Sequence, residues 1–412
     1  MRRNHEHGIV IVLVAVVMLF VVGAMAALSI DVVTFYTARS EAQLVADAAA
    51  LAAARVLANS GATSDTTGTL GLMALAEPLA SAVAIQVAQN SMVGGRYLVA
   101  GEVVVNFSGT PPNPHVTVRA QRTDLPTFFA RIWGSQQVTV AASATAEAYN
   151  PSGAIATAAT AAPPVAPLCV KPWLLPNADP YTSGTIFNPT TGAITDASLL
   201  GWSSFSTGGV PMNLATSGLT AWQYYVGDPS SFPAPTQALP ACAAAWTDPY
   251  RLGVAGCVQM PISCNSTVNT YVPGEVLDTE DAVNCLTHAT TTGGGDTVTS
   301  VNPPSAPFQF VAGDDNPIPG LARSNVMVSD SLVTVPVFDT VSFTAPGSPV
   351  TIIGFVQLFL NPDGNAAPAN ISFPDSVNTT VINMAGCGAK ASGTPILGNG
   401  ASPVTVRLIS PP

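Results

Sequence analysis

Residues 9–30 read IVIVLVAVVMLFVVGAMAALSI, which is 22 consecutive positions without a charged side chain. At about 1.5 Å of rise per residue, a helix over this stretch is roughly 33 Å long, enough to cross the hydrocarbon core of a bilayer. Arg2 and Arg3 precede it, and positive charge on the short flank predicts that the N-terminus stays in the cytoplasm. The sequence therefore predicts a single-pass membrane anchor, with residues 31–412 outside the cytoplasm.

The same helix is expected to continue beyond the membrane. Residues 31–60 (DVVTFYTARSEAQLVADAAALAAARVLANS) are rich in Ala and contain neither Pro nor Gly. Steps of four place a mostly polar stripe along one face, made of Asp31, Phe35, Arg39, Gln43 and Asp47. An apolar face beside it contains Val32, Leu44, Ala48 and Leu51. The stripe is either a solvated surface or a docking face for a partner helix.

These residues also carry a resemblance to a known family. The order Asp31, Tyr36, Arg39, Gln43 and Asp47, followed by AAALAA, resembles the N-terminal segment of TadE/TadG-like proteins of tight-adherence (Flp-type) pilus assembly. It covers about the first 60 residues closely, and Val33 stands where the family usually has Gly. The resemblance implies a bacterial inner-membrane protein whose bulk is periplasmic or extracellular. It would be a structural or assembly component that joins pilus-assembly or envelope proteins through these five residues. It implies no catalytic residue, so the protein is not expected to be an enzyme.

Two kinds of N-terminal processing compete with a retained anchor. Ala24-Met25-Ala26 before Ala27 fits a secretory signal cleavage site, but the apolar run and the helical pattern continue through it. Cleavage of a type IV prepilin would follow Gly8, but Leu13 stands where such pilins carry a Glu. We favour the retained anchor, and all three interpretations export residues 31–412.

Composition agrees with export and excludes some classes of protein. Charged residues make up only 9% of the 412 positions, while the chain has 34 Gly and 36 Pro. This chain is too hydrophobic to be disordered, and its formal net charge of −11 argues against binding nucleic acid, which needs basic patches. Residues 150–167 (NPSGAIATAATAAPPVAP) have the composition of a linker.

The pattern predicts an α+β fold in four parts: an anchor and helical extension (1–60), a helix with a small antiparallel pilin-like sheet (61–149), the linker, and a mainly β domain with long loops (168–412). In the second part we expect a helix over 70–90, interrupted at Glu77-Pro78, and one or two helical turns over 125–133. The expected strands are 97–107, 115–122 and 136–149, and in the distal part 326–337, 350–360 and 404–409.

Six cysteines lie beyond the linker: Cys169, Cys242, Cys257, Cys264, Cys285 and Cys387. An even number on the exported side favours disulfides. Pairing within 242–285 is expected, because shorter loops lose less entropy on closure. A metal site is disfavoured, because the chain has no CxxC and only His288 of its four histidines lies near the cysteines.

Other chemical signals are weak. The chain has no GxSxG, HExxH or GxxxxGK[ST] motif, so no catalytic, cofactor or metal residue is predicted. Two acidic clusters, 278–281 (DTED) and 313–316 (GDDN), could ligate calcium, although neither has EF-hand spacing. An exported polysaccharide-binding protein or hydrolase stays open as the alternative function. Its sugar platform would use Trp173, Trp202, Trp222 or Trp246.

Overall fold

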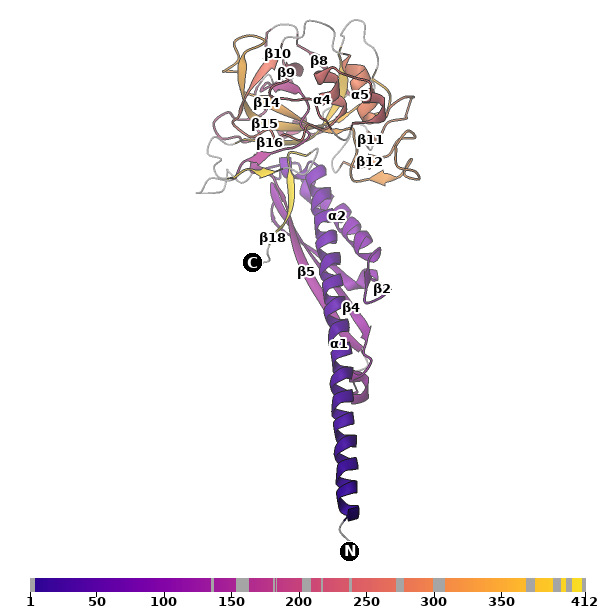
Figure 1. The fold of residues 1–412 in the computed structure, drawn as a ribbon. Helices are drawn as coiled ribbons and strands as arrows, with labels where there is room; N and C mark the ends of the chain where they lie inside the picture. The colour runs from indigo at the N-terminus through magenta and orange to yellow at the C-terminus, as the bar shows by residue number, and fades with distance from the viewer. Residues whose placement is uncertain are drawn as a thin grey trace.

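The computed structural model describes residues 4–134, 137–152, 163–180, 182, 184–201, 209–215, 218–236, 239–271, 278–298, 308–367, 375–387, 394–397 and 402–409. It has the α+β architecture that the sequence predicts, with a rod-like N-terminal part and a mostly β distal part at the end of the rod (Figure 1). The α-helices are α1 (Asn4–Asn59), α2 (Leu72–Gln89), α4 (Pro249–Ala255) and α5 (Thr279–Thr287). Short 3-10 helices are η1 (Ala62–Ser64), η2 (Ala100–Glu102), η3 (Ala130–Trp133), η4 (Ala197–Leu199) and η6 (Ala241–Ala243).

Helix α1 is continuous from the apolar segment to the base of the distal part. Its second half buries a stripe of alanines without any exposed area: Ala38, Ala42, Ala46, Ala49, Ala50, Ala53, Ala54 and Ala58. A methyl side chain lets another backbone approach closely, so helix and sheet can pack on this stripe at short range. The stripe contacts both the proximal sheet and α2.

The proximal sheet has four antiparallel strands in the order β18–β5–β4–β3. Its strands are β3 (Val103–Thr110), β4 (Asn113–Pro126), β5 (Gln137–Tyr149) and β18 (Thr405–Ile409). On β4, burial alternates, so that Val116, Val118 and Ala120 face α1 and the core while their neighbours face outward. The strands predicted over 115–122 and 136–149 are therefore confirmed. The strand predicted over 97–107 is confirmed only from Val103 onward, because Ala100–Glu102 forms η2.

Strand β18 departs from the expected division of the chain. Residues 404–409 were assigned to the distal domain by composition, but Thr405–Ile409 pairs with Tyr149–Thr145 of β5. The C-terminal strand thus returns to the rod and extends the proximal sheet, as Figure 1 shows. Pairing over this sequence distance leaves no local signal that a sequence pattern could reveal.

Helix α2 packs along the upper half of α1 (Figure 1). Ala76, Ala80, Ala84 and Ala88 recur every four residues and are fully buried. The interruption predicted at Glu77-Pro78 does not occur, because α2 runs through Pro78. Pro78 removes one hydrogen bond to the carbonyl of Ala74; both residues are exposed, so water can satisfy that carbonyl.

The distal part is built around a sheet that closes on itself. Its strands are β7 (Trp173–Pro176), β8 (Val210–Leu214), β9 (Gln223–Gly227), β10 (Thr267–Tyr271), β14 (Leu332–Phe338), β15 (Pro349–Leu360) and β16 (Val377–Gly386). Successive pairings β15–β14, β14–β7, β7–β9, β9–β8, β8–β16 and β16–β15 form a ring, which we call the distal barrel. Closure satisfies edge groups that an open sheet would expose.

The remaining strands are short. They are β1 (Met92–Val93), β2 (Arg96–Tyr97), β6 (Val165–Ala166), β11 (Thr297–Val298), β12 (Phe310–Val311), β13 (Asn325–Val326) and β17 (Ile396–Leu397). Strands β11, β12 and β13 form a small sheet beside the barrel, and β17 pairs with β6. The strand predicted over 326–337 therefore divides between β13 and β14.

Three disulfides tie the distal part together and account for all six cysteines: Cys169–Cys257, Cys242–Cys285 and Cys264–Cys387. The prediction of disulfides is confirmed. The expectation of pairing within 242–285 is correct for Cys242–Cys285 and wrong for Cys257 and Cys264, which pair with partners outside that range. The topology of the barrel, and not loop length, decides these two partners.

A buried polar network fastens the rod to the distal barrel. Asn383 on β16 donates from its amide to the carbonyl of Ala58 and accepts from the hydroxyl of Ser64. Asn150 at the end of the proximal sheet donates to the carbonyls of Thr63 (3.1 Å) and Met384 (2.8 Å). The side-chain amides of Asn150 and Asn383 keep these hydrogen bonds only if the end of α1, the end of the proximal sheet and the barrel stay in one fixed arrangement.

The alanine stripe gives a direct test of this packing. Ala49→Leu adds three carbons at a position with no exposed area, and overpacking of this kind costs about 1–3 kcal/mol. The free energy of unfolding in mild detergent, followed by circular dichroism, should fall by that order.

Ala48→Leu is the matched control, since Ala48 is the neighbouring residue and is exposed. This variant should unfold like the parent protein. Equal stability of both variants would show that the stripe does not pack as described.

Candidate functional site

The first half of α1 has the surface of a membrane segment. Large apolar side chains stay exposed on all sides between Val10 and Ile30, among them Leu19 and Phe20, which are both 76% exposed. By length and composition, α1 and α2 are each apolar enough to cross a membrane. Helix α2 buries its alanine face in the core of the proximal part, whereas the first half of α1 is almost uncovered. Of these two helices, α1 is therefore the candidate membrane span.

Asp31, the first residue after the apolar run, is buried by its own chain. Its carboxylate accepts hydrogen bonds from the backbone N–H groups of Phe128 (2.9 Å), Phe129 (3.0 Å) and Ala130 (2.7 Å). These amides belong to the connection between β4 and β5, which ends in η3. Asp31 is thus an internal fastener between α1 and the sheet, and only 1% of it is exposed. The sequence pattern places Asp31 on a stripe that is open to solvent or to a partner protein. The structure corrects this prediction, because the carboxylate of Asp31 is buried within the chain.

The other four residues of the predicted assembly face lie farther along α1. Tyr36 is 75% exposed, and Arg39 and Gln43 are also exposed. Asp47 is half-buried and accepts a hydrogen bond from the amide of Gln43 (2.7 Å), which also reaches the carbonyl of Ser143. The polar pair Gln43–Asp47 therefore lies at the margin of the sheet.

The structure adds two apolar residues that the polar pattern did not single out. Val33 is 64% exposed and Leu44 is 71% exposed, on the side of α1 opposite the alanine stripe. We call Val33, Tyr36, Arg39 and Leu44 the outer face of α1. Large apolar groups at these exposures on a water-exposed helix are typical of a protein–protein contact. Leu44 could have been found from the sequence, because it belongs to the predicted apolar face of Val32, Leu44, Ala48 and Leu51. That face is not buried as a whole in the structure.

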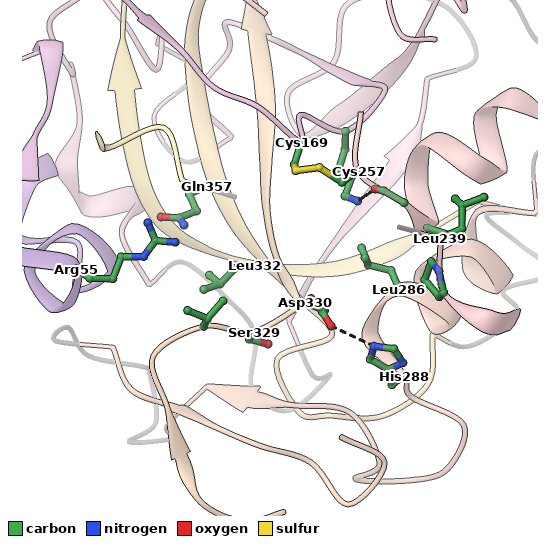
Figure 2. Close-up of a pocket in the computed structure, with 15 residues that line it drawn as sticks. Arg55, Cys169, Leu239, Cys257, Leu286, His288, Ser329, Asp330, Leu332 and Gln357 are labelled. Carbon is green, nitrogen blue, oxygen red and sulfur yellow. Dashed lines mark hydrogen bonds and ion pairs between the residues drawn. A yellow bond between two sulfur atoms is a disulfide. The ribbon is translucent and has the colours of Figure 1, made fainter. Parts of the chain in front are cut away.

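The second candidate is a cavity of about 600 Å³ between the end of α1 and the distal part, shown in Figure 2. Arg55 reaches it from α1, Gln357 and Leu332 from the barrel, and His288 from the end of α5. The Cys169–Cys257 disulfide forms part of its wall.

Lys171 lines this cavity and is fully enclosed by protein. Its ammonium group donates to the carbonyls of Val254 and Gly256, both at 2.7 Å. Burial lowers the pKa of Lys171 to about 7, and the negative charge of Asp330 only partly opposes this effect. Lys171 therefore joins the start of β7 to the end of α4.

Three more polar residues of the cavity, His288, Ser329 and Asp330, are also engaged by the chain itself. His288 and Asp330 lie 3.1 Å apart, and this hydrogen bond raises the pKa of His288 against the effect of burial. The hydroxyl of Ser329 donates to Asp296 at 2.6 Å. Among the described lining residues, Ser329 is therefore bonded to a carboxylate and not to His288, so the geometry of a nucleophile with its base is not formed there.

The acidic clusters proposed for calcium carry other bonds. Arg251 contacts Asp278 (3.1 Å) and Asp281 (3.5 Å). Arg323 forms a two-pronged pair with Asp314, while Asp315 accepts from Thr290. Within the described residues, no group of three or more His, Cys, Asp or Glu side chains is placed to hold a metal ion. Both clusters are ion pairs and loop fasteners in this structure.

Three of the four candidate sugar-stacking tryptophans can be placed. Trp173 is fully buried in the barrel and donates to the hydroxyl of Tyr250 at 2.8 Å, and Trp222 is 5% exposed. Trp246 is half-buried and carries the guanidinium of Arg251 4.1 Å from the centre of its ring. Trp202 lies outside the described residues. These three rings serve as core or as a cation contact, and they do not form an open platform.

Comparison with known families finds one match. Residues 8–56 match the profile described as "Putative Flp pilus-assembly TadE/G-like". The N-terminal segment is TadE/G-like. No curated protein and no solved structure matches the chain. The matched segment lies entirely on α1 and contains the apolar run, Asp31, the outer face and the alanine stripe as far as Ala54, so the match supports a membrane-associated role in pilus assembly.

The buried lysine predicts how stability depends on pH. In the unfolded chain a lysine titrates near pH 10.4, so above pH 7 the unfolded state binds more protons than the folded state, and folding becomes more favourable as pH rises. Between pH 8 and pH 9.5 the free energy of unfolding should rise by up to about 2 kcal/mol. Chemical unfolding at a series of pH values measures this slope.

Lys171→Met should flatten the slope, since methionine fills similar space without a titrating group. His288→Gln serves as the control. Because the pKa of His288 is raised in the folded state, its contribution to the free energy of unfolding falls as pH rises through that pKa, which is opposite in sign to the effect of Lys171. A slope that persists in Lys171→Met would mean that this amine is not the titrating group.

Proposed function

We propose that this protein is a membrane-anchored structural component of a tight-adherence (Flp-type) pilus-assembly apparatus and that it binds other assembly proteins through the outer face of α1. The observation that carries the proposal is the exposure of Val33, Tyr36 and Leu44 within the TadE/G-like segment but beyond the membrane span. A solvated helix in water has no need of three large apolar groups at 64–75% exposure.

The partner is expected to be another helix or a shallow apolar groove. Val33 and Tyr36 lie one helical turn apart, and Leu44 lies two turns beyond Tyr36 near the same face, a spacing that can enter an apolar groove. Arg39 adds a cation to the outer face. An acidic group on the partner that pairs with it would determine how the partner is oriented on α1, and would add less to the affinity. The distal barrel, held rigidly at the other end, would project away from the membrane.

The disulfides support placement of the distal part outside the cytoplasm. Three bridges occur in the structure, and such bonds persist in oxidising compartments and are rare in the cytosol. With the positive flank at Arg2 and Arg3, the proposal is an inner-membrane protein with its N-terminus in the cytoplasm and its bulk in the periplasm.

The alternative, an exported polysaccharide-binding protein or hydrolase, has less support. The described tryptophans are buried or covered, and Lys171, His288 and Ser329 in the cavity are bonded to other groups of the chain. We therefore favour the assembly role and propose no enzymatic activity.

The outer face can be tested in living cells. A photo-crosslinking residue at Tyr36 should give adducts with another Tad assembly protein, and Arg39→Glu should reduce them several-fold, because it reverses the only charge on the face. Arg39→Lys keeps the charge and should restore them.

The matched control is a crosslinker at Val341, which is 85% exposed on the distal part. Adducts formed at Val341 but not at Tyr36 would place the docking surface on the distal part and refute the assignment to α1.

Topology makes a separate prediction. An alkaline phosphatase reporter fused at the C-terminus should be active, since this enzyme needs the oxidising exterior to form its own disulfides. Replacing Arg2 and Arg3 by Glu should reduce correct insertion. Reporter activity confined to a cytoplasmic fluorescent fusion at the same end would show that the C-terminal part is not exported.

A further inference from the structure

The connection between β4 and β5 lies at the level of the membrane boundary. Its sequence over residues 127–134, TFFARIWG, contains three aromatic residues and one arginine; we call it the β4–β5 tip. Asp31, one residue past the apolar run, binds three of its backbone amides. Figure 1 shows this end of the hairpin beside α1, far below the distal barrel.

Burial on α1 continues below Asp31 into the apolar run. On the face of α1 that carries Asp31, Ala27 is only 7% exposed and Ala24 is half-buried. From Ala24 to Asp31 the helix rises about 10 Å. On its other sides, the same stretch exposes Met25 (69%) and Leu28 (57%), which require an apolar surrounding. One face of the helix is therefore covered by protein at a depth where the remaining faces meet lipid.

The exposed groups of the tip suit a lipid interface. Phe128 is 62% exposed and points away from the core, although a phenylalanine in water is unfavourable. Arg131 is exposed close to it. Aromatic rings with a neighbouring cation are the combination that proteins place at the boundary of headgroups and acyl chains.

Backbone polarity usually prevents a loop from entering this region, because N–H groups without partners are costly away from water. Here the N–H groups of Phe128, Phe129 and Ala130 are bonded to the Asp31 carboxylate, and that of Gly134 is bonded to the carbonyl of Arg131 at 3.1 Å. Four of the N–H groups that would oppose insertion thus already have partners.

We infer that the β4–β5 tip is a second membrane contact: Phe128 inserts into the outer boundary of the bilayer while Arg131 binds lipid phosphates. The contact would fix the rotation of the rod about the axis of α1 and its tilt, which a single helix cannot do. The inference rests on α1 as a membrane anchor, but not on the identity of the pilus.

The test uses the full-length protein in vesicles of phosphatidylethanolamine and phosphatidylglycerol. All six native cysteines are in disulfides, so a single cysteine can be labelled with an environment-sensitive fluorophore. Phe128→Cys should give blue-shifted emission that lipids spin-labelled near the headgroup quench several-fold more than they quench a label at Val341→Cys, on the distal part. Arg131→Cys reports on the same tip if Phe128→Cys does not fold.

Leu19→Cys, within the span, separates the two levels of the account. If Leu19 is quenched by lipid and Phe128 is not, the tip does not touch the membrane and the inference fails, while the anchor stands. If neither is quenched, the anchor itself is wrong. A blue shift at Phe128 without quenching by lipid would mean that protein, such as a second copy of the chain, covers the tip, and this also overturns the inference.

Discussion

Close packing on the alanine stripe of α1 is the interaction on which the other contacts depend. From Ala38 to Ala58 the helix presents methyl groups to β4 and β5 on one side and to α2 on another. Because this contact lies on the helix that we propose as the membrane anchor, it would also set the orientation of the sheet relative to the bilayer. The hydrogen bonds of Asn150 and Asn383 then hold the barrel in a fixed orientation relative to the rod.

This arrangement explains why function is expected at the rod and not in the barrel. The two fasteners of the rod, Asp31 below and Asn383 above, leave the outer face of α1 without a covering element. In the distal part, by contrast, the lysine, histidine and tryptophans that could support chemistry are bonded internally. The barrel, closed by strand pairing and by three disulfides, is suited to be a durable exported body.

Local patterns in the sequence were sufficient for the span, its helical continuation and the proximal strands, since periodicity and composition act over a few turns. They failed where distant residues meet. Asp31 looks like part of a solvated stripe, because its partners are about a hundred positions away in the chain. Cysteine partners were misjudged because loop entropy is a weak guide: doubling a loop costs only about 0.6 kcal/mol, so a separation of 123 residues, as in Cys264–Cys387, is hardly disfavoured against one of 43. The helix break predicted at Pro78 is wrong for another reason. The carbonyl of Ala74, which Pro78 leaves without a hydrogen bond, lies on the exposed side of α2, where water can bind it.

The central claim is that one unbroken helix crosses the membrane boundary and continues beyond it as the support for the sheet and the barrel. Hydrogen–deuterium exchange of the full-length protein in lipid nanodiscs, followed on peptides that cover residues 28–60, tests it most directly. The account predicts that the amides of residues 31–58 exchange as slowly as those in the interior of β4 and β5. Rapid exchange between Asp31 and Ser40, with protection returning only after Ala42, would show that the helix breaks at the membrane surface and would contradict the account.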